Sequence, residues 1–271
     1  MTAPTKPQLL AVIGALLLFV LLLLSRKTEN AVTEKVQTRS ALQTFSIDKL
    51  IDSVKAGLDN KLLTLMAEQE KQENRIAAQD SLAKIWRFLK QPGIQAACLE
   101  KIALMSNTCP TWNAAGEAFY KASHFSEENW RHFYMDKAVS AYQKASQIDS
   151  SNTDAKLNLA ICYVEGTSEP MKGILLLREI VAQDSTNIKA QLSLGMFAVQ
   201  SGQLEKALER FKRIVKIDPN FAEAYLYMGE TLVKLGRKSE AIEALEQFKN
   251  KSKDETVVSE VANYIDQLKN S

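Results

Sequence analysis

The amino-acid sequence predicts an all-α fold made of repeated helical hairpins, and three observations lead to this prediction. Apolar residues recur three and four residues apart along most of the chain after residue 46, which is typical of amphipathic helices. Turn segments of similar sequence begin at Asp149, Asp184 and Asp218, so they are spaced 35 and 34 residues apart. A pair of one large and one small residue follows each turn at a similar distance, which indicates that two helices pack closely in every repeat.

The composition excludes several classes of protein. The 271 residues include 34 Lys and Arg against 32 Asp and Glu, a net charge of +2, which gives no electrostatic reason to expect nucleic-acid binding. The three cysteines, Cys98, Cys109 and Cys162, form no CxxC pair and are odd in number. We therefore expect no disulfide framework and a reducing compartment. No zinc-type spacing joins the two histidines to these cysteines, so we expect no metal site.

Residues 1–25 predict a membrane anchor. Residues 9–24 are sixteen apolar residues without a charge. As a helix they span about 24 Å of a hydrocarbon core of roughly 30 Å. Lys6, Arg26 and Lys27 flank the segment and can reach the headgroups. A cleaved signal peptide is the alternative, but the charged exit SRKTEN lacks an A-x-A site, so we favour an uncleaved single-pass helix.

The side of the membrane on which the rest of the chain lies stays open. Arg26, Lys27, Lys35 and Arg39 come after the apolar segment, whereas Lys6 alone precedes it. The count of basic residues favours the cytoplasmic side. An N-terminal signal-anchor more often exports the remainder of its chain, so the periplasmic side is the alternative.

Residues 26–75 read as a polar tether followed by an amphipathic helical segment. Residues 26–45 lack a sustained apolar period, and from residue 46 the apolar positions Ile47, Leu50 and Val54 share one helical face. This segment is either an ordinary packing helix or one that binds a partner.

The small residues in the repeats have a physical purpose. Two antiparallel helices approach closely where one of them offers little side chain, and we expect Gly195 and Gly229 to provide that gap. Gly202 and Gly236 fall between two predicted helices, where a left-handed residue ends the first helix.

This spacing and residue set resembles the tetratricopeptide repeat, a helix–turn–helix of 34 residues. The clearest copies are 153–187, 188–221 and 222–255, and the third contains Met228, Gly229 and Ala241 where the family has its large and small residues. Gly173 departs from the pattern, because alanine is usual there. Weaker copies begin at residues 76 and 112, the second with an insertion near 123–134, and a closing helix covers 254–270. The resemblance implies that 76–271 is a right-handed superhelical solenoid.

More narrowly, the chain resembles membrane-anchored tetratricopeptide proteins of Bacteroidetes-type bacteria, which share its KPQLL start and its LAxxW segment. This resemblance implies a bacterial cell inner membrane as the location.

The resemblance implies a scaffold that binds an extended peptide or a helix in a concave groove. The carboxylate clamp known in this family requires Lys, Asn and Arg. The matching positions here are Leu157, Ile161, Ser193, Glu223 and Tyr227, so we do not expect a clamp. The positions that the resemblance places in the groove are mostly apolar. They are Leu157, Ile161, Val164, Leu192, Met196, Val199, Leu226, Glu230 and Val233.

Two occupants explain an apolar groove. The partner is an apolar helix or peptide of another protein, or it is the chain's own segment 47–66. Alternatively, tight packing between repeats buries these side chains without any ligand. An aromatic cluster around Phe125 and Trp130 allows a binding loop, but we favour packing of a longer helix.

Enzyme signals are absent from the sequence. It contains no GxxxxGK[ST], GxGxxG, HExxH or GxSxG motif, and we read Glu127, Glu128 and His132 as exposed charge on a helix. We therefore expect neither catalysis nor a cofactor. The sequence favours a membrane-anchored scaffold or adaptor for protein–protein interaction. The alternative is an exported envelope-assembly or chaperone-like factor.

Overall fold

The computed structural model describes residues 46–270, and a compact unit begins at Ile47. The predicted anchor in 1–25 and tether in 26–45 lie outside the described residues. Within the described part, no helix has both the length and the apolar character needed to cross a membrane.

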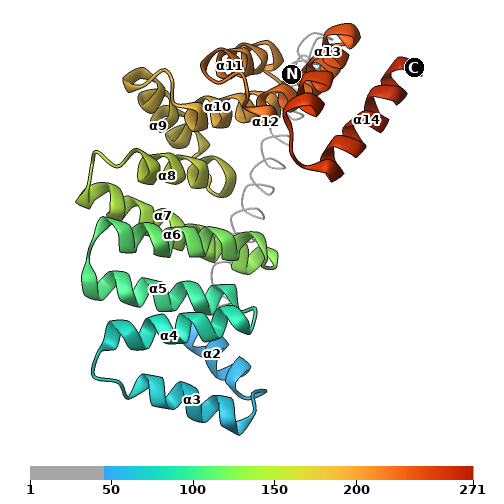
Figure 1. The fold of residues 1–271 in the computed structure, drawn as a ribbon. Helices are drawn as coiled ribbons and strands as arrows, with labels where there is room; N and C mark the ends of the chain where they lie inside the picture. The colour runs from blue at the N-terminus through green and yellow to red at the C-terminus, as the bar shows by residue number, and fades with distance from the viewer. Residues whose placement is uncertain (1–45, 271) are drawn as a thin grey trace, which may run out of the picture. The chain divides into compact units, whose positions relative to one another are not determined.

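Helices alone make up the secondary structure of the described residues, as the sequence predicts (Figure 1). They are α2 (Ile47–Lys55), α3 (Asn60–Glu70), α4 (Arg75–Phe88), α5 (Pro92–Ser106), α6 (Cys109–His124), α7 (Glu128–Ile148), α8 (Thr153–Gly166), α9 (Pro170–Gln183), α10 (Ile188–Gln200), α11 (Leu204–Ile217), α12 (Ala222–Lys234), α13 (Lys238–Lys251) and α14 (Glu255–Asn270).

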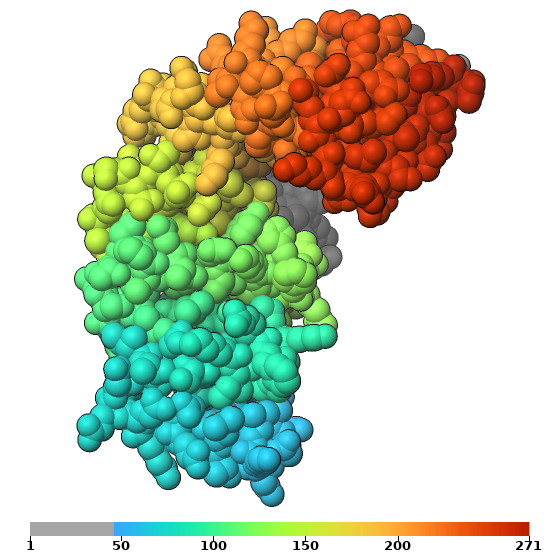
Figure 2. All heavy atoms as spheres, in the orientation of Figure 1, coloured from blue at the N-terminus to red at the C-terminus, as the bar shows by residue number. Residues whose placement is uncertain are grey.

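Successive helices pair as hairpins, and each hairpin packs on the next. The pairs α8 with α9, α10 with α11 and α12 with α13 begin at residues 153, 188 and 222, where the repeats were predicted to begin. Earlier pairs are α4 with α5 and α6 with α7, and α14 packs on α13 at the end. The space-filling view shows each colour band in contact with the next (Figure 2). Buried clusters occupy the layers between them, so the core is divided along the stack.

The repeated turns are built on an aspartate that bonds the backbone ahead of it. Oδ1 of Asp184 accepts hydrogen bonds from the backbone N–H of Thr186 at 2.9 Å and from its hydroxyl at 2.6 Å. Asp149 makes the same two bonds with Ser151. Asn187 then caps α10 by accepting from the N–H of Ala190 at 2.9 Å. These local bonds end one helix and start the next, which explains the regular spacing.

Glycine allows close helix contact, as predicted, at two positions. A Cβ added to Gly195 would lie 2.5 Å from Cε1 of Phe211, and one added to Gly229 would lie 2.5 Å from Cγ of Leu245. Gly173 is more than a departure from the usual alanine. A Cβ added at this position would collide with the carbonyl oxygen of Ala160. The α8–α9 hairpin is therefore too tight even for alanine.

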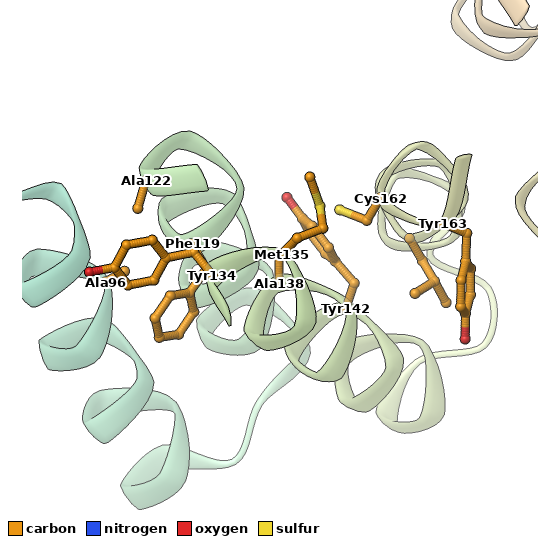
Figure 3. Packing of buried hydrophobic residues seen from close by; sticks show 10 residues of the cluster. Ala96, Phe119, Ala122, Tyr134, Met135, Ala138, Tyr142, Cys162 and Tyr163 are labelled. Atoms are coloured by element: carbon orange, nitrogen blue, oxygen red, sulfur yellow. The ribbon is translucent and has the colours of Figure 1, made fainter. Parts of the chain in front are cut away.

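The insertion near 123–134 lengthens two helices instead of forming a loop. Helix α7 begins at Glu128, so its first turns bring Trp130, Phe133 and Tyr134 against the stack. Tyr134 is buried, and its ring lies 6.2 Å from that of Phe119. Figure 3 shows these two rings together on one side of α7, and Met135 near Cys162 on the other. Trp130, Phe133 and Tyr134 thus pack a longer helix, which is the interpretation that the sequence favoured, whereas Phe125 is 80% exposed and does not join this packing.

Residues 47–75 belong to the same compact unit as the repeats. Met66 of α3 is 1% exposed and packs in a cluster with Trp86 and Ile94. Leu50 and Val54 of α2 pack against that cluster. The hypothesis that segment 47–66 fills the groove is therefore wrong for this structure, since its apolar face covers the start of the stack.

Candidate functional site

The nine predicted groove residues are divided among the layers between hairpins. Leu157 is buried, Glu230 is exposed, and the other seven are half-buried. Ile161 and Val164 pack against the cluster of Leu157, whereas Leu192 and Val199 pack against that of Phe211. Helix packing thus accounts for much of their burial. Whether a ligand also contacts these side chains stays a prediction.

A cleft that the sequence analysis missed lies between α9 and α11, above α10. Its volume is about 710 Å³. Helix α9 packs mainly on α8 and α10, which leaves space between α9 and α11. Part of the cleft lining is apolar and buried or half-buried. The residues of this part are Val164, Ile174, Leu194, Phe197 and Ala198.

The cleft and the predicted groove use opposite faces of α10. Gln191, Leu194 and Ala198 line the cleft and share one helical face. Leu192 and Met196 do not line it, and at about 100° per residue they point the other way. Of the nine predicted residues, Val164 alone lines the cleft.

Basic side chains dominate the charged lining of the cleft. Four cations from α9 and α11 face a single carboxylate, that of Glu209. Within residues 46–270, none of the four is in an ion pair. The lining therefore carries an excess of positive charge. The four cations are Arg178, Lys206, Arg210 and Arg213.

A buried amide holds Arg210 in place. The side chain of Gln191 is fully buried, and its Oε1 accepts a hydrogen bond of 2.7 Å from Nη1 of Arg210. Its Nε2 donates to the carbonyl of Ser185 at 3.1 Å. Partial burial, together with the like charges of Arg213 and Arg178, lowers the pKa of the Arg210 guanidinium. Arg210 thus lies close to other positive charges in the cleft.

Lys206, Arg210 and Arg213 are spaced four and three residues apart, so they form a stripe on one face of α11. That stripe is the sequence signal that could have indicated the cleft. Arg178 gave no such signal, because it comes from another helix and meets the stripe only in the folded chain.

A second, smaller cleft of about 170 Å³ is also lined by basic side chains, those of Lys55, Arg75 and Lys101. There the ammonium of Lys55 pairs with Oε1 of Glu70 at 3.1 Å.

The hydroxyl of Tyr120 donates to Oε2 of Glu165 at 2.7 Å, and the ring of His124 packs edge-on against Tyr120. Glu127, Glu128 and His132 are exposed on α7 or next to it, as expected. In the described part of the chain, no group of three or more His, Cys, Asp or Glu residues is placed to hold a metal ion.

The three cysteines are free and buried. Burial raises the pKa of Cys98 to about 11 and that of Cys162 to about 12. Thiols with such a pKa are protonated near neutral pH, so they behave as small apolar side chains in the core.

Comparison with protein families bears directly on the hairpins. Residues 198–259, which contain α11, α12 and α13, match the family model described as tetratricopeptide repeat. The match covers less than a quarter of the chain, and over this segment the chain is similar to tetratricopeptide repeats. The α8–α9 hairpin shares its helix order and spacing, and the earlier hairpins share the order, which supports a tetratricopeptide-type stack over the described helices.

The proteins similar to this chain include two solved structures and a curated protein. The crystal structure of MamA protein superimposes with a TM-score of 0.50 at 17% identity, and covers 66% of this chain and 93% of that one. The structure of Pseudomonas aeruginosa PilF gives a TM-score of 0.52 at 16% identity, and covers 72% of this chain and 85% of that one. At such identity these likenesses show the fold alone.

The curated relative is a Haemophilus influenzae protein, CcmH, named for cytochrome c-type biogenesis. It is 28% identical over 117 residues, which are 42% of this chain. The match spans a quarter of the length of that protein, 25%.

Proposed function

We propose that this chain is a protein-binding scaffold, held at a bacterial cell membrane by residues 9–24, and that it acts by binding a protein and not by catalysis. The observation that carries the proposal is the stack of tetratricopeptide-type hairpins with a lined cleft in its surface. Such stacks present extended surfaces to other proteins.

The anchor rests on the sequence. Residues 9–24 have the length and apolarity of a membrane helix, and basic residues come directly after them. The count of basic residues supports a cytoplasmic position for the repeats. In this arrangement the membrane would keep the scaffold close to membrane-bound partners and raise their effective concentration.

A second candidate function is assembly or chaperoning in the envelope, with the repeats on the periplasmic side. The similarity to the Haemophilus influenzae protein named for cytochrome c-type biogenesis supports it. Both candidates are binding functions, and they differ in the side of the membrane on which the repeats work.

Cross-linking in living cells followed by purification from membranes tests the proposal. The full chain with a C-terminal tag is compared with a variant that lacks residues 9–24. We expect the full chain in the membrane fraction, bound to a discrete partner, and the variant in the soluble fraction. A full chain that is soluble and captures no partner would contradict the proposal.

Protease treatment of spheroplasts then separates the two candidates. Digestion of the tagged repeats from outside supports the envelope-assembly function. Protection until the membrane is permeabilised supports the cytoplasmic scaffold.

A further inference from the structure

We propose that the cleft between α9 and α11 binds an acidic protein segment that also carries large apolar side chains. This inference rests on the proposed scaffold function and adds the chemistry of the partner and the place where it binds. The place is the face of α10 opposite to the predicted groove.

Charge complementarity is the first argument. Arg178, Arg210 and Arg213, with Lys206, line one cleft against the single carboxylate of Glu209. Guanidinium groups bind carboxylates through paired, charge-assisted hydrogen bonds, and the buried Gln191 fixes Arg210 in advance. Less side-chain conformational freedom is then lost when an acidic ligand binds.

Apolar surface is the second argument, and it selects a protein segment over a simple anion. Met171 lines the cleft and is 59% exposed. Leu175 is exposed one helical turn further along α9, outside the lining. Ile174 and Leu194 also line the cleft. A free phosphate would leave this surface in water, whereas leucine-type side chains beside carboxylates would cover it.

The chain's own tether does not have the required charge. Residues 26–45 contain four basic and two acidic residues, so they would be repelled by the arginines. We therefore assign the cleft to an acidic segment of another protein.

Fluorescence anisotropy with the full chain in detergent micelles tests the proposal. The probe is a fluorescein-labelled peptide of four Glu-Glu-Leu-Leu units. One control peptide has Lys in place of Glu, and the other has Ser in place of Leu. We expect the acidic apolar peptide to bind at least tenfold more tightly than either control, and its affinity to fall as NaCl is added.

Charge reversal locates the site. Arg178→Glu with Arg213→Glu should weaken binding of the acidic apolar peptide at least tenfold. The matched control is Lys61→Glu with Lys253→Glu, which makes the same change in net charge at exposed residues outside the cleft. It should change the affinity less than threefold. Both arginines are exposed, so thermal unfolding of the variant should be unchanged, and this checks its fold.

Several results would overturn the proposal. One is equal binding by the wild type and the arginine variant, and another is equal binding by the lysine peptide. Equal binding by the serine peptide would make the cleft a simple anion site. Displacement of the probe by phosphatidylglycerol vesicles but not by unlabelled peptide would assign it to lipid. If a partner still co-purified with the arginine variant from cells, this inference would be contradicted but the scaffold function would not. If no partner co-purified with the wild type, the scaffold function would be contradicted too.

Discussion

Gln191 and Arg210 join the two helices of the α10–α11 hairpin through one hydrogen bond of 2.7 Å, from Nη1 of the arginine to Oε1 of the amide. The other end of the amide donates to the carbonyl of Ser185 in the turn before α10. A single buried side chain thus connects the turn, the hairpin and the basic lining of the cleft.

Replacing this amide should be costly for stability. Gln191→Leu removes the hydrogen-bond partner of the Ser185 carbonyl and of the half-buried Arg210 guanidinium. Because hydrogen bonds to charged groups contribute more than neutral ones, we expect a loss of about 1–3 kcal/mol in the free energy of unfolding. Urea unfolding of the full chain in detergent, followed by circular dichroism, measures it. Gln247→Leu, at an exposed site on α13, is the control and should change stability by less than about 0.5 kcal/mol. Equal stability of the two variants would contradict the role given to Gln191.

Gly173→Ala should destabilise the chain although alanine is usual at this place in the repeat. The added Cβ would collide with the backbone oxygen of Ala160, which cannot rotate away. We expect a loss of about 1–3 kcal/mol, measured by thermal unfolding. Gly57→Ala is the matched control, because its Cβ would find its nearest neighbour at an ordinary 3.6 Å. A neutral or stabilising effect of Gly173→Ala would mean that α8 and α9 do not pack as closely as described.

The Asp184 turn predicts a dependence of stability on pH. Hydrogen bonds from Thr186 lower the pKa of the Asp184 carboxyl below 3.8. A carboxyl whose pKa is lower in the folded than in the unfolded state stabilises the fold at pH values above its unfolded pKa. This contribution is lost as the pH falls through the folded pKa. Asp184→Asn should therefore unfold at a lower temperature than the wild type at pH 7, and the difference should shrink as the pH falls below 3.8.

Thr186→Val provides the control for this turn, since it removes the hydroxyl donor but keeps the carboxylate. It should reduce the dependence on pH without abolishing it, because the backbone N–H still donates. Melting temperatures between pH 7 and pH 3 measure both variants. If the difference in melting temperature between Asp184→Asn and the wild type stayed constant down to pH 3, the role given to the Asp184 carboxylate would be refuted.

Met66→Ala tests whether residues 47–75 are part of the stack. Met66 is buried under Trp86 and Ile94, so its truncation should cost about 2–4 kcal/mol and increase hydrogen exchange in α4 and α5. Leu65→Ala removes a neighbouring exposed side chain and should have little effect. Unchanged exchange in α4 after Met66→Ala would mean that the first hairpin does not stabilise the repeats.

The sequence predicts the hairpins well because each repeat is a local unit. The period is visible in the turns at Asp149 and Asp184, and the small residues at Gly195 and Gly229 report contacts between consecutive helices. The contact of α3 with α4 escaped prediction because nothing around Met66 marks the partner of its apolar face.

The cleft was not predicted for a different reason. The cleft depends on which helix faces stay uncovered after neighbouring hairpins pack. Arg178 and Arg210 line it together only because the hairpins stack, and they are far apart in the sequence. The concave groove was inferred from the family, and several of its residues contribute to packing between hairpins.

Site-specific photo-cross-linking in cells tests most directly whether this chain holds a protein at the α9–α11 cleft. A photoreactive amino acid replaces Met171, which lines the cleft and is 59% exposed, or Leu104 of α5, which is 60% exposed and lies outside it. We expect a discrete cross-linked protein from position 171, lost when Arg178 and Arg213 are changed to Glu, and no such product from position 104. Equal products from both positions, or none from position 171, would contradict the account.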